Sequence, residues 1–373
     1  MRYKILFISS WFPNKLEPTN GNFVQRHAEA VSQLHDVEIL HSIGDSMQKE
    51  TYLFDDKIIN RIRTVIVYYK NSKNPVLNFI RRMTAYKKGF SRLQQPDLVH
   101  ANVLHNSMLF AVYLKKKFEI PFVITEHWSG FLKINSAQLS KLQVFTAKTI
   151  ANQASYVLPV SQYLLNDVRG LGWKCNFQVV GNVVDTELFR VKSQTNRPFT
   201  FLHISNLIPL KNPEKIIAAA LKLRLDFNHF ELHIGGDGDV QKLDKLVQDH
   251  KAEGFIKTFS LLPLTEVAEK MKHSDCFILL SDYENFPCVL LESLSTGTPA
   301  IATKVGGIPE IINDKNGILI SNSADELYSA MKNILEKNVI FDEPEELHDY
   351  IQKHFSINII AQKFDEIYQQ ILR

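Results

Sequence analysis

The sequence predicts an α/β protein made of two Rossmann-like domains, each built on a doubly wound parallel sheet. Its 373 residues exceed what one hydrophobic core supports, since single cores stop growing at roughly 250–300 residues. Short apolar, β-branched runs alternate with amphipathic segments, which is typical of βα units and parallel sheets. The alternation stops at a polar segment, 192–198, and starts again at residue 199. We therefore expect a linker there and one domain on each side of it.

In the first domain, taken as residues 1–190, six apolar runs are predicted to be strands and two amphipathic stretches to be helices. The strands are expected at 4–8, 36–40, 97–101, 122–125, 156–159 and 178–180, and the helices at 25–34 and 77–93.

The second domain, taken as 191–356, repeats the scheme. Its strands are expected at 199–205, 231–234, 256–259, 276–280, 300–302 and 317–320. A last apolar-periodic segment, 357–373, is predicted to be a helix that joins the first domain.

Cysteine usage and hydropathy predict a cytoplasmic protein. Cys175, Cys276 and Cys288 lack CxxC spacing and no N-x-S/T acceptor occurs, so neither a disulfide framework nor glycosylation is indicated. No stretch reaches the roughly 18 apolar residues of a membrane span. Any membrane contact is therefore expected to be peripheral, at the inner face of the membrane.

Charge is unevenly divided along the chain. Residues 1–190 carry 24 Lys and Arg against 14 Asp and Glu, whereas residues 191–373 carry 19 against 26. The basic residues gather among aromatic ones, at Arg81, Arg82, Lys87, Lys88, Arg92, Lys115, Lys116 and Lys117. This mixture suits anionic lipid headgroups or an acidic acceptor, and the alternative is ordinary solvated helix faces. Nothing in the motifs indicates nucleic acid as a partner.

Two glutamates eight residues apart carry the main functional signal. Glu284 follows an expected strand, and Glu292 lies in the early turns of a helix expected from Pro287 to Thr296. Ligands of α/β sheets bind outside the carboxyl ends of strands, so both acids can reach one crevice and accept sugar hydroxyls. The alternative is a pair of acids that complement a helix dipole.

The passage 281–310 closely resembles the signature of family 4 glycosyltransferases, including the E-x7-E spacing and the G-G-x-P-E element at Gly306, Gly307 and Glu310. That resemblance implies the GT-B architecture, two Rossmann-like domains facing across a cleft, with the nucleotide sugar held mainly by the second. It also implies that Glu292 binds the ribose and Glu284 the donor sugar. Asn285 and Phe286 are expected to line the same donor site.

A lysine in front of the first helix of the second domain is the expected diphosphate ligand. Lys211 precedes Asn212, a good N-cap, and Pro213, a good first helical residue. A diphosphate would find a cation beside free helix amides, and the family uses a lysine here. Asn206 stands where the family usually carries arginine, which implies weaker stabilisation of the leaving diphosphate.

The glycine turn at 235–238 resembles the family's G-x-G turn, and Gly236 is expected to let the backbone approach the nucleotide. Asp237 and Asp239 have the D-x-D spacing of a metal site, but no His or Cys lies nearby in the sequence. We expect no metal there, and the Rossmann G-x-G-x-x-G is not satisfied either.

In the first domain the resemblance is more diffuse. Gly21 matches the family's glycine loop, although Asn22 replaces a common second glycine. His127 ends a strand and matches the family's histidine near the donor sugar, so it is our candidate at the reacting centre. His100 and His105 are expected to be packing or polar lining.

Retention in this family implies that the acceptor hydroxyl attacks the face that the diphosphate leaves, with a diphosphate oxygen taking the proton. The resemblance thus implies a retaining hexosyltransferase that uses no metal and no cofactor. A UDP- or GDP-sugar would be its donor, and a saccharide or lipid-linked saccharide of surface polysaccharide assembly its acceptor. Two alternatives stay open: a sugar-nucleotide epimerase, which consumes donor without acceptor, and a weakly catalytic binding or scaffold protein.

Overall fold

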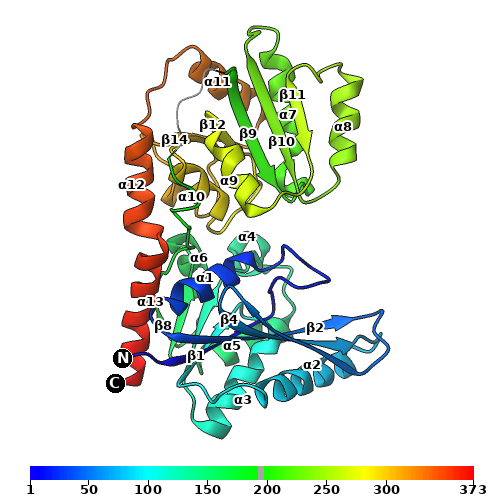
Figure 1. The fold of residues 1–373 in the computed structure, drawn as a ribbon, viewed down its shortest axis with the longest axis vertical. Helices are drawn as coiled ribbons and strands as arrows, with labels where there is room; N and C mark the ends of the chain where they lie inside the picture. Colours follow the sequence, from blue (N-terminus) through cyan, green and yellow to red (C-terminus); the bar gives the residue numbers. More distant parts are fainter. Residues whose placement is uncertain (192–196) are drawn as a thin grey trace. The chain divides into compact units, whose positions relative to one another are not determined.

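The computed structural model describes residues 1–191 and 197–373, which form two compact units (Figure 1). Unit 1 consists of Met1–Val183 together with Ile357–Arg373, and unit 2 is Val184–Ser356. The division thus lies at Val183 and Val184, earlier than the expected 190. Residues 192–196 of the expected linker lie outside the described residues.

In the described part of unit 1, one sheet runs in the order β3-β4-β2-β1-β5-β6-β7-β8. All neighbouring strands are parallel except β3 and β4, which form an antiparallel hairpin. The strands are β1 (Lys4–Ser9), β2 (Asp36–Asp45), β3 (Tyr52–Ile59), β4 (Ile62–Lys70), β5 (Leu98–Asn102), β6 (Phe122–Glu126), β7 (Tyr156–Pro159) and β8 (Asn176–Phe177). The strand expected at 178–180 is wrong, because those residues continue β8 only through single backbone hydrogen bonds to β7.

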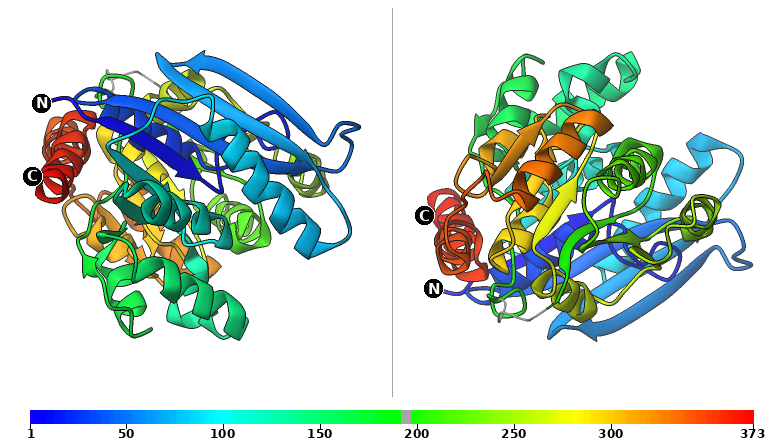
Figure 2. Two further views of the ribbon diagram at one scale, coloured as in Figure 1. Left: turned by 90° about the horizontal axis from the view of Figure 1, so that it is seen from below. Right: turned by 90° about the horizontal axis from the view of Figure 1, so that it is seen from above.

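The helices of unit 1 connect these strands. They are α1 (Asn22–Ser32), α2 (Pro75–Phe90), α3 (Leu109–Phe118), α4 (Lys133–Ser136), α5 (Lys141–Ala151), α6 (Gln162–Arg169) and α13 (Ile357–Leu372), with 3-10 turns η1 (Asn106–Met108) and η2 (Ser129–Phe131). α13 buries Ile360, Phe364 and Ile367, at helical spacing, in the same core as Val24 and Val31 of α1. Both chain ends lie on this side of unit 1 (Figure 2).

In the described part of unit 2, an all-parallel sheet runs in the order β11-β10-β9-β12-β13-β14. Its strands are β9 (Phe199–Ser205), β10 (Phe230–Gly236), β11 (Ile256–Phe259), β12 (Cys276–Leu279), β13 (Ala300–Thr303) and β14 (Gly317–Ile320). Its helices are α7 (Pro213–Leu223), α8 (Val240–Asp249), α9 (Leu264–Lys272), α10 (Cys288–Ser295), α11 (Ala324–Leu335) and α12 (Pro344–Phe355), with 3-10 turns η3 (Pro209–Lys211) and η4 (Ile308–Glu310). The prediction of two Rossmann-like parallel-sheet domains is confirmed.

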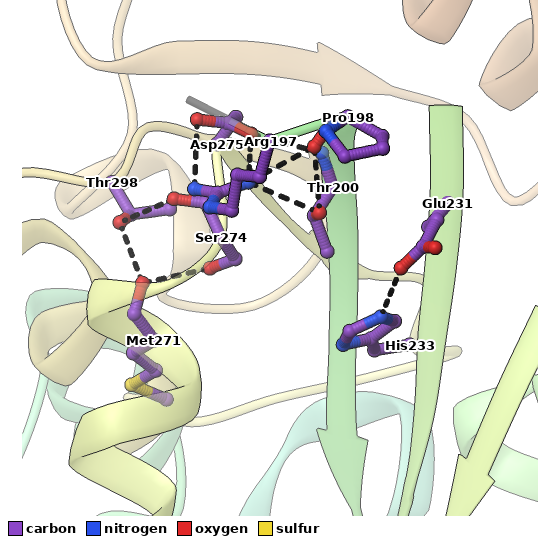
Figure 3. Close-up of polar contacts among 9 residues, drawn as sticks. All are labelled: Arg197, Pro198, Thr200, Glu231, His233, Met271, Ser274, Asp275 and Thr298. Carbon is purple, nitrogen blue, oxygen red and sulfur yellow. Dashed lines mark hydrogen bonds and ion pairs between the residues drawn. The ribbon is translucent and has the colours of Figure 1, made fainter. Parts of the chain in front are cut away.

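A polar cluster connects the amino ends of β9 and β12 (Figure 3). Arg197 donates two hydrogen bonds to the carboxylate of Asp275, at 2.6 and 3.1 Å, just before β12 begins. The same carboxylate accepts the backbone N–H of Thr200 in β9 at 2.9 Å. This bidentate pair connects the start of β9 to the start of β12. The loops that carry Lys211 and Glu284 follow the opposite, carboxyl ends of these two strands.

Several histidines are buried in the two cores, and burial lowers the pKa of His27, His41 and His203 to about 4. Their folded pKa values lie below the ordinary value of 6.5, so the unfolded chain takes up protons first as pH falls. The stability that these neutral histidines contribute is complete above about pH 6.5 and is lost as pH falls toward about 4.

We therefore expect the free energy of unfolding to drop between about pH 7.5 and about pH 5, by about 2 kcal/mol for each such histidine. Urea unfolding at the two pH values measures the drop. His203→Asn should make this drop in the free energy of unfolding smaller, whereas the same change at the exposed His250 should leave the drop unchanged. A free energy of unfolding that stays flat over this range would contradict the expectation.

Candidate functional site

The candidate residues of unit 2 lie in loops at the carboxyl edge of its sheet. The chain runs outward from β9 through β10 to β11, and in the other direction from β12 through β13 to β14, so the order reverses between β9 and β12. Open α/β sheets bind ligands outside the carboxyl ends of strands at such a switch point. Lys211 follows β9 and Glu284 follows β12, so they come from the two strands that border it.

Lys211 and Glu284 form an ion pair across this point. The Lys211 Nζ donates to Oε1 of Glu284, and the Ser281 hydroxyl donates to the same oxygen at 2.8 Å. The side chains of Lys211 and Glu284 are only 16% and 13% exposed. Water therefore screens this pair less than it screens an exposed ion pair. Ser281 was not singled out from the sequence, although it begins the passage that resembles the family signature.

The loop that carries Glu284 rests on two glycines. The backbone N–H of Gly307 donates to the Glu284 carbonyl at 3.3 Å. Gly306 has a φ of +55°, and a Cβ there would lie 1.7 Å from that same carbonyl oxygen. Only glycine allows this approach. The G-G-x-P-E element therefore sets the backbone position of Glu284.

Asn212 occupies the N-cap position of α7, but its predicted capping bond is wrong. Among the described residues, its side chain accepts no hydrogen bond from the helix amides. Its φ of 48° turns the amide instead toward the loop after β12, where Nδ2 donates to the Leu280 carbonyl at 3.1 Å and to Asp282 Oδ1 at 2.9 Å. Asn212 thus joins the two loops that carry Lys211 and Glu284.

The glycine turn after β10 passes close to the end of β9. Gly236 has a φ of +135°, and a Cβ there would lie 2.0 Å from the Ser205 carbonyl oxygen. A Cβ on Gly238 would lie 2.7 Å from the carbonyl oxygen of Asn206. Asp239 caps α8, because its side chain accepts the backbone N–H of Lys242 at 3.2 Å. The turn therefore packs against Asn206 and starts a helix.

The remaining unit 2 candidates are buried. Glu292 lies on α10 and is 5% exposed, and Asn285 is 9% exposed. The Phe286 ring lies 5.5 Å from that of Phe355 on α12. Glu292 is therefore a buried carboxylate in the helix that follows the Glu284 loop.

In unit 1, the structure brings the glycine loop close to His127. Gly21 precedes α1 with a φ of +74°, and a Cβ there would lie 2.4 Å from the Trp11 backbone. The ring of Phe23, in the first turn of α1, lies 4.1 Å from the His127 ring. Burial, with the nearby His27 and His100, lowers the pKa of His127 well below its ordinary value. His127 is therefore neutral at physiological pH.

His100 and His105 have partners that explain them structurally. The buried His100 ring bonds to Thr125 Oγ1 at 2.6 Å and to the Tyr368 hydroxyl of α13. His105 Nδ1 lies 2.9 Å from the Ser107 hydroxyl at the start of η1.

Sequence reasoning missed Glu126, the last residue of β6. Its carboxylate is buried and accepts the backbone N–H groups of Leu104 at 2.7 Å and Trp128 at 2.6 Å. Burial raises the pKa of Glu126 to about 7. It joins the loops after β5 and β6 and thereby orients His127. A charged residue at the end of an apolar strand was the available signal.

The basic residues of α2, and Arg92 just after it, are packed on the protein surface. Lys87 lies over the Tyr113 ring at 4.7 Å, and Arg92 over the Phe54 ring at 3.7 Å. Arg82 donates to the Tyr69 hydroxyl at 3.0 and 3.2 Å and to Asn106 Oδ1 at 3.2 Å. No helix of the described chain is long and apolar enough to cross a membrane.

Two family models match the chain, one for each half. The model described as Glycosyltransferase Family 4 matches residues 21–188, and the one described as Glycosyl transferases group 1 matches residues 185–354. Together they cover residues 21–354, which include every candidate residue named above.

The chain is also similar to proteins of known name. It is 24% identical to the putative teichuronic acid biosynthesis glycosyltransferase TuaC of Bacillus subtilis, over 99% of both chains. It is 24% identical to a phosphatidylinositol N-acetylglucosaminyltransferase subunit of Arabidopsis thaliana, over 77% of this chain but only 61% of that protein. The crystal structure of Anabaena HepE with UDP and glucose superposes with a TM-score of 0.75 at 17% identity, over 99% and 100% of the two chains. The fold is therefore GT-B.

Proposed function

Since the chain belongs to glycosyltransferase family 4, we propose that it transfers a hexose-type sugar from a nucleotide-sugar donor to a saccharide or lipid-linked saccharide, with retention of anomeric configuration. The observation that carries this proposal is the Lys211–Glu284 pair at the switch point of the unit 2 sheet. A cation and a carboxylate side by side match the diphosphate and the hydroxyl groups of such a donor.

In the proposed complex, Lys211 binds the donor diphosphate and Glu284 accepts hydroxyl groups of the sugar. Glu292 accepts the ribose hydroxyls, and Asn206, Gly236, Asn285 and Phe286 line the same donor site. A UDP-sugar is the first donor to test, because the HepE structure holds UDP and glucose, and a GDP-sugar is the second. No metal or cofactor enters the proposal.

The ion pair has a consequence for donor binding. Glu284 pairs with Lys211, so an incoming diphosphate must displace the Glu284 carboxylate from the lysine. The Glu284 oxygens are then left to accept the sugar hydroxyls, with the Ser281 hydroxyl still at hand. Donor binding thus replaces the Lys211–Glu284 pair with two contacts, Lys211 to the diphosphate and Glu284 to the sugar. A nucleotide without its sugar makes only the first of these contacts.

Unit 1 contributes Gly21 and His127 to the proposal, with the acceptor bound by loops of the same unit. In a retaining transfer the acceptor hydroxyl attacks the face from which the diphosphate departs, and a diphosphate oxygen takes its proton. The protein then orients the reactants and stabilises the departing negative charge. A neutral His127 can exchange a hydrogen bond with a donor-sugar hydroxyl without adding charge.

The acceptor belongs to surface polysaccharide assembly in this proposal, which the full-length similarity to TuaC supports. A lipid-linked acceptor would place the protein at the cytoplasmic face of the membrane as a peripheral protein.

The test is to incubate the protein with UDP-, GDP- and ADP-sugars, with and without saccharide acceptors, and to measure nucleotide release. We expect release that depends on the acceptor, and a product whose anomeric proton has the donor's configuration by NMR. Donor consumed without acceptor would indicate an epimerase. Binding without release would indicate a scaffold protein, and an inverted product would contradict retention.

Glu292→Ala should weaken donor binding more than it slows turnover. A ribose contact is the same in the ground and transition states, so its loss raises the donor KM and leaves kcat nearly unchanged. Steady-state kinetics with varied donor measure both constants. An unchanged KM with a lowered kcat would contradict the assignment.

A further inference from the structure

Three large apolar side chains stand exposed on α4 and α5 of unit 1. Ile134 on α4 is 67% exposed, and Leu142 and Phe145 on α5 are 72% and 68% exposed. Leu142 and Phe145 are three residues apart, so they share one face of the helix. A helix on the surface of a water-soluble protein normally turns polar residues outward.

α5 is a well-formed helix whose inner face is packed. A capping box fixes its first turn: the Ser140 hydroxyl accepts the Gln143 backbone N–H at 3.2 Å, and the Gln143 side chain accepts the Ser140 N–H at 2.8 Å. Ala147 and Ile150 on the inner face are buried. The outward direction of Leu142 and Phe145 is therefore set by the packing of the opposite face.

The same segment is cationic and has no acidic residue. Residues 127–166 contain Lys133, Lys141 and Lys148 and neither Asp nor Glu. Glu126, just before the segment, is buried on backbone amides, and Asp167, just after it, accepts the backbone N–H of Lys133 at 2.8 Å. Within the described chain, none of these three lysines forms an ion pair or lies over an aromatic ring, in contrast to Lys87 of α2 and Arg92 just after that helix.

We propose that α4 and α5 dock unit 1 on an anionic lipid bilayer, with Ile134, Leu142 and Phe145 inserted among the acyl chains and the three lysines on the lipid headgroups. Interfacial helices that bind membranes combine these two features. Each lysine near an anionic surface strengthens binding about fivefold.

Charge favours a bilayer over a second copy of this chain. A symmetric dimer through this face would place each lysine of the surface near lysines of the other copy, with no carboxylate of the segment to pair with them. Anionic headgroups supply the missing negative charge. The inference is independent of the donor site and specifies where the proposed peripheral membrane contact is made.

The experiment is co-sedimentation of the full chain with phosphatidylcholine vesicles, with and without phosphatidylglycerol. We expect binding only to the anionic vesicles, weakened by added salt. The double variant Leu142→Ser, Phe145→Ser should bind about 30-fold or more weaker, because apolar area no longer leaves water. The triple variant Lys133→Gln, Lys141→Gln, Lys148→Gln should bind roughly a hundredfold weaker.

Leu225→Ser with Ile340→Ser is the matched control, since these side chains are 85% and 89% exposed in unit 2. It should bind like the unchanged protein. Equal binding to neutral and anionic vesicles, no binding to either, or undiminished binding by the Leu142, Phe145 variant would overturn the proposal. So would a dimer, seen by sedimentation velocity without vesicles, that this variant converts to monomer.

Discussion

Lys211→Ala should lower kcat by about 10²–10³, the usual cost of removing one contact to charge that develops in the transition state. Negative charge grows on the leaving diphosphate as the glycosidic bond breaks, so the lysine stabilises the transition state more than the bound donor. Asn206 stands where the family usually has arginine, which leaves Lys211 with less support. Adding Asn206→Arg to the variant should therefore recover part of the loss.

The ion pair with Glu284 makes this prediction sharper. In Lys211→Ala the largely buried Glu284 carboxylate loses its cation, whereas Glu284→Gln removes the charge that competes with the diphosphate. The kcat of the double variant Lys211→Ala, Glu284→Gln should therefore fall by less than the two single effects combined. Lys222→Ala, at the exposed end of α7, is the control and should keep full turnover. If Lys211→Ala kept more than about a third of the normal kcat, Lys211 would not be the diphosphate ligand.

Gly306→Ala should lower kcat by about 10², although residue 306 itself bears no functional group. An alanine Cβ would lie 1.7 Å from the Glu284 carbonyl oxygen and would have to adopt a φ of +55°. The loop must then shift, and a displacement of about 1 Å at a reacting centre costs about 10²-fold.

Gly254→Ala is the matched control, because a Cβ at that position meets nothing within 4 Å. Measured side by side, the Gly254 variant should retain its turnover and the Gly306 variant should not. If both variants turned over equally well, the backbone position of Glu284 would not matter for catalysis.

Much of the fold could be predicted because buried parallel strands have a strong local pattern. The strands at Phe199–Ser205, Ile256–Phe259 and Gly317–Ile320 were predicted with their observed bounds. The C-terminal helix was predicted at 357–373 and is observed at Ile357–Leu372. Gly317–Ile320, for example, is a short apolar run between Asn316 and Ser321.

The β3–β4 hairpin was missed for two physical reasons. It breaks the βα alternation on which the prediction relied, and β3 is a sheet-edge strand in which every residue is partly or fully exposed. Its turn uses Asn60 and Arg61, both at positive φ, in place of the Asn-Gly pair that signals such a hairpin. The apolar run in β4 was the signal that could have been used.

The site was predictable as a set of residues but not as an arrangement. Glu284 and Lys211 were each found from their local sequence, yet they lie 73 residues apart, and their pairing depends on β9 and β12 being neighbours. The same holds for Asn212, whose side chain bonds to the β12 loop in place of its own helix. Long-range contacts of this kind follow from strand order, which no local pattern contains.

A thermal-shift titration with UDP-, GDP- and ADP-sugars tests the central claim, that unit 2 holds a nucleotide-sugar donor through Lys211, Glu284 and Glu292, most directly. A ligand at about a hundred times its Kd stabilises the native state by about 2.7 kcal/mol, which raises Tm measurably. We expect one class of nucleotide sugar to raise the Tm of the unchanged protein, and Glu292→Ala and Lys211→Ala to reduce that rise at equal ligand concentration. No rise with any nucleotide sugar, or an equal rise in both variants, would contradict the account.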